Sequence, residues 1–111
     1  MPSEIRYKRG DTEPALEQTL TRNGEPVDLS SADSVRLVAD DRNRTIVLDI
    51  AAEIVDDAGE VRVEWAAGDL DLPPAEYAAE WVIEFGDRTL TLPPSGFIQF
   101  VIEATAIRST S

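Results

Sequence analysis

The chain lacks two residue types on which most reactive and metal-binding sites depend. Its 111 residues include no cysteine and no histidine. The absence of cysteine excludes disulfides, zinc–thiolate sites and cysteine nucleophiles. The absence of histidine removes the commonest general base and the commonest metal ligand. The composition therefore predicts a protein that is not an enzyme and that holds no cofactor and no metal.

Basic residues are also scarce. The 10 basic residues are outnumbered by 22 acidic ones, which gives a formal net charge of −12, and Lys8 is the single lysine. A surface this negative repels nucleic-acid phosphates and anionic lipid headgroups, so we expect neither nucleic acid nor a membrane as a partner. An acid-rich, lysine-poor composition is typical of proteins that work in molar salt, where screening acts over about 3 Å. The sequence favours such a halophilic protein over a merely acidic mesophilic one.

Long apolar runs are missing as well. No stretch approaches the roughly 20 apolar residues of a membrane helix, and residues 1–6 lack the apolar run of a signal peptide. We therefore expect a soluble protein made in the cytoplasm. Hydrophobic residues make up 42% of the chain, which is ordinary for a globular fold, and the length suits one domain. No linker or internal repeat divides residues 1–111.

What the chain does contain is alternation of apolar and charged residues in its middle and second half. Residues 60–65 and 76–85 alternate in this way, with small residues at 78 and 79. A period of two places one set of side chains on a core and the other in water, as in a half-buried strand. Asn23–Gly24 and Gly86–Asp87 supply the residues of tight hairpin turns. The pattern predicts an all-β protein.

The turn signals recur every 8–12 residues, which is the spacing expected of a β-sandwich. We predict about seven or eight antiparallel strands, with residues 30–33 as a one-turn helix or a loop between two of them. The expected strands cover residues 15–21, 34–40, 45–55, 60–66, 76–85, 88–92 and 97–103, after an extended start at 5–8. The predicted core between two sheets contains Val63, Trp65, Trp81, Ile83, Phe85 and Phe100.

Pairs of carboxylates are the nearest approach to a metal site. Asp69 and Asp71 lie two residues apart in a loop and could offer oxygen ligands to calcium, but the twelve-residue loop with its glycine and terminal glutamate is missing. The pattern favours a solvated acidic turn here, and the same interpretation holds for Asp40–Asp41 and Asp56–Asp57. A glycosidase would need two carboxyl groups across a sugar-sized cleft, and a domain of this size forms little cleft.

Two further features have a structural and a functional interpretation. Arg9–Gly10–Asp11 spells a cell-adhesion tripeptide, but Gly10 and Asp11 are also residues that shape a turn, which we favour. Trp65 and Trp81 could form a platform for a ligand, but their positions in the alternating strands favour the core. No serine lies in a nucleophile-elbow context, and no glycine-rich phosphate loop is present.

Several short motifs follow one another in a fixed order over roughly residues 9–103. They are Arg9–Gly10–Asp11–Thr12, then Pro14, Leu16 and Leu20, then Asn23–Gly24, then Pro26–Val27–Asp28–Leu29 with Ser30 and Ala32, then Gly59, Val61, Val63 and Trp65, then the acidic loop 69–74, then Tyr77, Ala79, Glu80 and Trp81, and last Pro93, Pro94 and Gly96. This ordered set resembles the N-terminal domain of tailed-phage baseplate upper proteins and related small virion proteins. The chain departs from that pattern at Pro73–Pro74, where the family usually has a proline–glycine turn.

The resemblance implies an immunoglobulin-like β-sandwich with a structural role in a virus particle. It implies a protein that docks onto other virion proteins, is assembled in the host cytoplasm and forms a homo-oligomer within the particle. With the acidic composition, it implies a virus of a salt-loving host. Head, head–tail junction, tail and baseplate all use such sandwiches, so all four locations stay open.

The two ends of the chain are candidate arms that could pair with the sheet edge of a neighbouring copy. These arms cover residues 1–8 and 104–111, and we expect removal of residues 1–8 to leave the monomer folded. The residues predicted to contribute most are Ile5, Arg6, Tyr7, Ile107 and Arg108.

Two alternative functions remain. One is a receptor- or glycan-binding module displayed on the virion, for which Tyr7, Tyr77 and Phe97 are the aromatic candidates. The other is a cellular immunoglobulin-like domain. An exposed aromatic patch would favour the first, and the neighbouring genes would identify the second.

Overall fold

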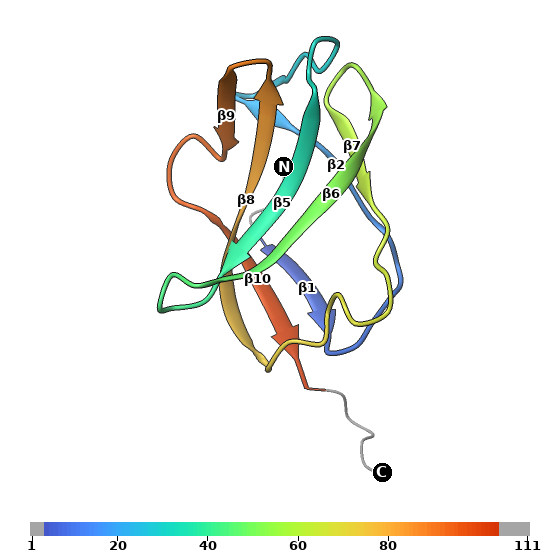
Figure 1. Cartoon of the computed structure of the whole chain (residues 1–111), viewed down its shortest axis with the longest axis vertical. Helices are drawn as coiled ribbons and strands as arrows, with labels where there is room; N and C mark the ends of the chain where they lie inside the picture. The colour runs from blue at the N-terminus through green and yellow to red at the C-terminus, as the bar shows by residue number, and fades with distance from the viewer. Residues whose placement is uncertain (1–3, 105–111) are drawn as a thin grey trace.

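The computed structural model describes residues 4–104 and contains no helix within that range (Figure 1). The prediction of an all-β protein is therefore confirmed. The ten strands are β1 (Glu4–Lys8), β2 (Leu16–Thr19), β3 (Thr21–Arg22), β4 (Glu25–Pro26), β5 (Ser34–Asp40), β6 (Ile46–Asp56), β7 (Glu60–Val63), β8 (Ala75–Phe85), β9 (Arg88–Leu92) and β10 (Ile98–Glu103).

Eight of these strands form one curled sheet, in the order β1-β10-β8-β5-β6-β7-β2, with β9 also paired to β8. The long strand β8 organises it: the first half of β8 pairs with β10 and its second half with β9, while β5 pairs along its other side. Figure 1 shows β8, β5 and β6 side by side across the middle of the molecule. The remaining strands, β3 and β4, form a separate two-stranded ribbon.

The curl of the sheet comes from β6, because the two halves of this long strand pair with different neighbours. Its first residues pair with β5, from Ile46 to Ala52, and its last residues pair with β7, from Glu53 to Asp56. Register shifts interrupt the β5–β6 ladder between Ala39 and Asp40 and the β6–β7 ladder near Val55. Such bulges bend a strand and increase its twist. The prediction of one strand over residues 45–55 is thus confirmed, with a register shift near its end.

The sheet closes around one hydrophobic core. Alternation in β5 and β8 sends Val35, Leu37 and Ala39 inward from the first strand and Tyr77, Ala79, Trp81 and Ile83 inward from the second. Of the six residues predicted to form the core, five are buried and Phe85 is half-buried. Trp65 lies just after β7, but it packs edge-on against Tyr7 and stacks with Phe100. Aromatic pairs of this kind stabilise a core beyond their buried area.

The predicted hairpin turns form. In a further turn, glycine is required because a side chain would have no room. Asn23 and Gly24 have φ values of 55° and 84° and join β3 to β4, while Gly86 has a φ of 63° between β8 and β9. Gly59, in the turn between β6 and β7, is buried against the β3–β4 ribbon. Residues 30–33 form a turn and loop rather than a helix.

Candidate functional site

The first predicted arm is a strand of the fold. Residues 4–8 pair in parallel with β10, in a register that places Ile5 opposite Phe100 and Tyr7 opposite Ile102. Both Ile5 and Tyr7 are buried in the core. This burial argues against the expectation that residues 1–8 can be removed from a folded monomer, because the last strand supplies β1 with a partner within the same chain. Ile107 and Arg108 of the second predicted arm lie outside the described residues.

Arg6 is the exposed member of this group. Its guanidinium donates hydrogen bonds to the carboxylates of Glu4 and Glu103, which raise the pKa of the guanidinium. Glu4, Arg6 and Lys8 together line the exposed side of β1. Charged side chains on an edge strand discourage pairing with an arbitrary neighbour. Among the described strands, β1 therefore has β10 as its one partner and presents charged side chains on its exposed side.

The acidic pairs predicted as weak calcium candidates serve as turn residues. The Asp69 carboxylate accepts a hydrogen bond from the Ala66 amide at 2.7 Å, and the Asp69 amide donates to the Ala66 carbonyl. Asp71 instead forms an ion pair with Arg9 at 2.8 Å. Because the two carboxylates are committed to different partners, the structure favours the interpretation as an acidic turn.

The other two acidic pairs behave alike. The Asp41 carboxylate accepts hydrogen bonds from the amides of Asn43 and Thr45, and the Asp56 carboxylate accepts one from Ala58. In Asx turns of this kind the aspartate side chain accepts a hydrogen bond from a nearby backbone amide, which would otherwise bond to water. No group of three or more acidic side chains is placed to hold a metal ion anywhere in residues 4–104.

The adhesion-like tripeptide also forms a turn. Gly10 has a φ of 85°, and the Asp11 carboxylate accepts a hydrogen bond from the Lys8 amide at 3.0 Å. The Gly10 amide donates to the carbonyl of Leu70 in the loop before β8. These contacts attach the end of β1 to that loop, as the turn interpretation predicted.

The aromatic residues proposed as a ligand platform are mostly inside. Trp65 and Trp81 are buried, so their prediction as core residues is confirmed. Tyr7 and Tyr77 are buried too, and their hydroxyls donate hydrogen bonds to the carbonyls of Pro14 and Pro73. Burial raises the pKa of both phenols. Among the predicted candidates, Phe97 alone is exposed.

Phe97 marks a surface that the sequence analysis did not single out. Its side chain is 60% exposed and lines a depression of about 470 Å³ over β5 and β8. Arg42 and Arg44, from the turn between β5 and β6, line the same depression, together with the acidic residues Asp40, Asp41 and Glu80. Neither arginine forms an ion pair within the described part of the chain, whereas Arg6, Arg36 and Arg62 each bind two carboxylates.

Ile46 extends this surface onto β6. It is 61% exposed and is the cross-strand partner of Asp40, which lines the Phe97 depression. We call Arg42, Arg44, Ile46 and Phe97 the arginine patch. A signal for it exists in the sequence: Arg42–Asn43–Arg44 is a basic turn in an acidic chain. That turn and Phe97 are far apart in the sequence, and β8 lies between their strands in the sheet. No local sequence pattern therefore predicts that they lie close together.

Within residues 4–104 no helix is long and apolar enough to cross a membrane. Six members of the ordered motif set face the core: Val61, Val63 and Trp65 in and after β7, and Tyr77, Ala79 and Trp81 in β8. The resemblance based on that set stays a prediction. The chain matches no protein-family model, and neither a curated protein nor a solved structure shows significant similarity to it.

Proposed function

We propose that this protein is a structural component of a tailed-virus particle that acts by protein–protein assembly and not by catalysis. The observation that carries the proposal is the ordered set of motifs over residues 9–103, which resembles virion proteins and many of whose apolar members lie in the core. In this proposal the curled sheet is an immunoglobulin-like sandwich, with β1, β10, β8 and β5 in one layer and β7 and β2 in the other.

The surface is consistent with an assembly role. Among the strands of residues 4–104, β1, β2 and β9 each have one paired neighbour in the curled sheet. Open edges are the sites at which a neighbouring chain can add a strand. Because each copy in a symmetric particle repeats its contacts, small surfaces of this kind suffice for stable assembly.

The alternative of a receptor- or glycan-binding module rests on Phe97 alone. Sugar sites need a flat aromatic face, and the other two aromatic candidates, Tyr7 and Tyr77, are buried. A glycan array probed in molar salt tests this alternative, and specific binding lost in Phe97→Ala would favour it over assembly.

The test of the proposed function is the composition of virus particles. Particles from a host culture that carries this gene are purified on a density gradient, and peptides of the chain are quantified by mass spectrometry. We expect the protein to sediment with the particles in a fixed multiple of a known capsid component. Its absence from intact particles would refute the structural role.

A further inference from the structure

One edge of the curled sheet lacks the charged side chains that usually protect an edge from pairing. Among the strands of residues 4–104, β1, β2 and β9 each have one neighbour in this sheet. Strand β1 presents charged side chains on its exposed side, and β2 carries the exposed Glu17. On β9 the exposed side chains that follow Arg88 are Thr89 and Thr91. Since charges on an edge strand discourage pairing, β9 is the least protected of the three edges.

The register of β9 on β8 shows which backbone groups of this edge are available to another strand. A two-residue turn joins the two strands, so its flanking residues Phe85 and Arg88 form a hydrogen-bonded pair. Along an antiparallel ladder such pairs alternate with pairs that exchange no hydrogen bond. The amides and carbonyls of Thr89 and Thr91 therefore point away from β8, and no described strand pairs with them. Figure 1 shows β9 at the margin of the sheet, beside β8.

A groove of about 600 Å³ adjoins this edge. Its apolar lining residues are Leu90 and Phe85, both half-buried, and its charged lining residues are Arg22, Arg88 and Asp28. Leu90 alternates with the exposed threonines, so it lies on the inner side of β9. A strand added to β9 would place its own inner side chain beside Leu90 and cover the apolar part of the groove.

We propose that β9 of a second copy adds to this edge in an antiparallel direction, around a two-fold axis at Leu90. The sequence Thr89–Leu90–Thr91 is the same in both directions, so this register places Thr89 of each copy opposite Thr91 of the other. The outward amides and carbonyls of the threonines then bond to those of the second copy. Threonine pairs across strands are stabilising, and the two Leu90 side chains meet over the groove.

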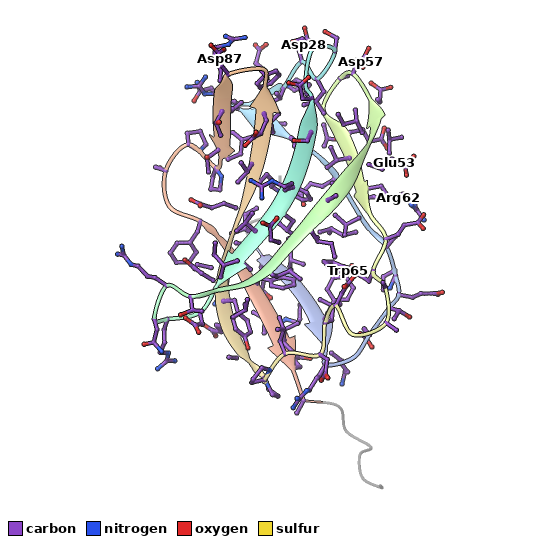
Figure 2. The ribbon with its side chains drawn as sticks, viewed as in Figure 1. Asp28, Glu53, Asp57, Arg62, Trp65 and Asp87 are labelled. Atoms are coloured by element: carbon purple, nitrogen blue, oxygen red, sulfur yellow. The ribbon has the colours of Figure 1, made fainter. Side chains whose placement is uncertain are left out.

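The same register keeps the carboxylates of the two copies apart, which matters for a chain of net charge −12. Asp87 is the acidic residue next to β9, at the tip of the β8–β9 hairpin (Figure 2). The two-fold axis would place the Asp87 residues of the two copies about 20 Å apart at the rise of an extended strand. That distance exceeds the screening length of about 8 Å at physiological salt. Glu84, the β8 neighbour of Thr89, lies 3.8 Å from Arg36 of its own chain.

The contact joins the same surface of both copies, so it stops at a dimer and merges the two curled sheets into one. A ladder between two five-residue strands is at the small end of protein interfaces, so we expect a weak dimer. Repetition in a symmetric particle would reinforce it. For its biological setting the inference rests on the proposed assembly function, whereas the contact itself is a property of the isolated chain.

The first experiment follows the mass of the wild type by light scattering up to about 1 mM protein, in about 0.15 M and about 1 M salt. Hydrogen exchange of the Thr89 and Thr91 amides is measured on the same samples. We expect a monomer–dimer equilibrium that shifts toward the dimer in molar salt, and protection of both amides that rises with the dimer fraction. A chain that is monomeric under both conditions would overturn the inference, as would a dimer in which both amides exchange freely.

A proline at position 91 tests the backbone contact. Thr91→Pro removes an outward amide that bonds to nothing in the described fold, and proline is tolerated on edge strands for this reason. We expect the dimer to be lost and the monomer to fold. The matched control is Thr91→Val, which keeps the amide and the branched shape of the side chain and should still dimerise. Equal dimerisation of the proline and valine variants would place the contact elsewhere and refute the inference.

Two double variants test the register and do not depend on proline. Thr89→Lys with Thr91→Lys places lysines opposite each other in both pairs, so we expect dimerisation at least about tenfold weaker than in the wild type, although the chain becomes less acidic. Thr89→Lys with Thr91→Glu places opposite charges in the same pairs and should dimerise about as well as the wild type. Dimerisation that is equal in the two double variants would refute this register. Thermal unfolding of each variant checks that it folds.

The outcome is separable from that of the proposed function. A monomeric chain that is nevertheless found in purified particles would refute the β9 contact and keep the structural role. A chain that dimerises through β9 but is absent from particles would do the reverse.

Discussion

The backbone carbonyl oxygen of Leu20 lies 2.7 Å from the position that a β-carbon would occupy on Gly59. The amide of Leu20 also donates a hydrogen bond to the Gly59 carbonyl at 2.8 Å, and the Val27 amide donates to the Leu20 carbonyl. The turn between β6 and β7 is thereby joined, backbone to backbone, to the β3–β4 ribbon. This junction has no room for a side chain at residue 59.

We expect Gly59→Ala to lower the free energy of unfolding by about 2–4 kcal/mol, because it adds a backbone clash to the cost of a positive φ. Gly59 has a φ of 95°. The matched control is Gly24→Ala, where φ is 84° but no atom lies within 4 Å of the added carbon. Urea unfolding of both variants measures the difference. Equal losses at the two positions would show that the contact with Leu20 contributes nothing.

The burial of β1 leads to a second prediction. Ile5→Ala should destabilise the protein by about 2–4 kcal/mol, because it leaves a cavity next to Phe100 in the neighbouring strand. Arg6→Ala, on the exposed side of the same strand, should leave the free energy of unfolding nearly unchanged, since exposed ion pairs contribute little. Chemical unfolding of the two variants provides the test. An Ile5→Ala variant as stable as Arg6→Ala would mean that β1 detaches readily.

Gln18 predicts a stabilising substitution. It is 7% exposed on β2, and neither its amide oxygen nor its amide nitrogen has a hydrogen-bond partner among the described residues. Because a buried polar group without a partner costs about 1–3 kcal/mol, Gln18→Met should raise the free energy of unfolding by about 1–2 kcal/mol. Gln99→Met, at a half-buried position of β10, is the control with little expected change. A less stable Gln18→Met protein would contradict this account of the amide.

Tyr7 and Tyr77 predict sensitivity to alkali. Burial raises the pKa of both phenols above the ordinary value of 10.0. Below that value both phenols are neutral in the folded and unfolded states, and stability is fully retained. As the pH rises further, the unfolded chain loses its phenol protons first, so stability falls through the folded-state pKa.

Urea unfolding from about pH 8 to about pH 11, beside an absorbance titration of the phenolates, measures this loss. In Tyr7→Phe we expect a smaller alkaline loss, together with a cost of about 1 kcal/mol at neutral pH for the lost hydrogen bond to Pro14. A wild type whose stability is constant across that pH range would contradict the prediction.

The net charge of −12 predicts a dependence on salt. Repulsion among the carboxylates should loosen the fold in dilute buffer, so Tm should rise by at least about 5 °C between dilute buffer and molar salt. Melting in sodium chloride, with a non-ionic osmolyte as the control, separates screening from a general solvent effect. A flat salt profile would remove the inference of a halophilic protein.

Local patterns in the sequence predicted most of the strands. Alternation over residues 76–85 gave the correct face for Trp81 and Ile83, and Asn23–Gly24 gave the correct hairpin turn, because these features depend on neighbouring residues. The parallel pairing of β1 with β10 was not predicted, since no local signal connects residue 5 with residue 100. The arginine patch was not predicted for the same reason, because the turn between β5 and β6 and the segment before β10 come together only when both strands pair with β8.

Gln18 illustrates a different limit. Its alternation with Leu16 and Leu20 is that of an inward-facing residue, yet its amide is polar, so pattern and chemistry disagree. Trp65 shows the converse: it was predicted in a strand and lies beyond the end of β7, but packing against Tyr7 and Phe100 still buries it. The apolar pattern thus predicts which residues are buried better than it predicts where the strands end.

The pairing of β1 with β10 also orders events on the ribosome. Residues 4–8 emerge early in synthesis, but the strand that pairs with them emerges only when residues 98–103 leave the exit tunnel. Until then Ile5 and Tyr7 have no place in a core, and the nascent chain carries an unpaired strand. Completion of the fold therefore waits for the last strand, and contacts of such long sequence separation form slowly. During this interval, chains that are synthesised close together can exchange their first strands.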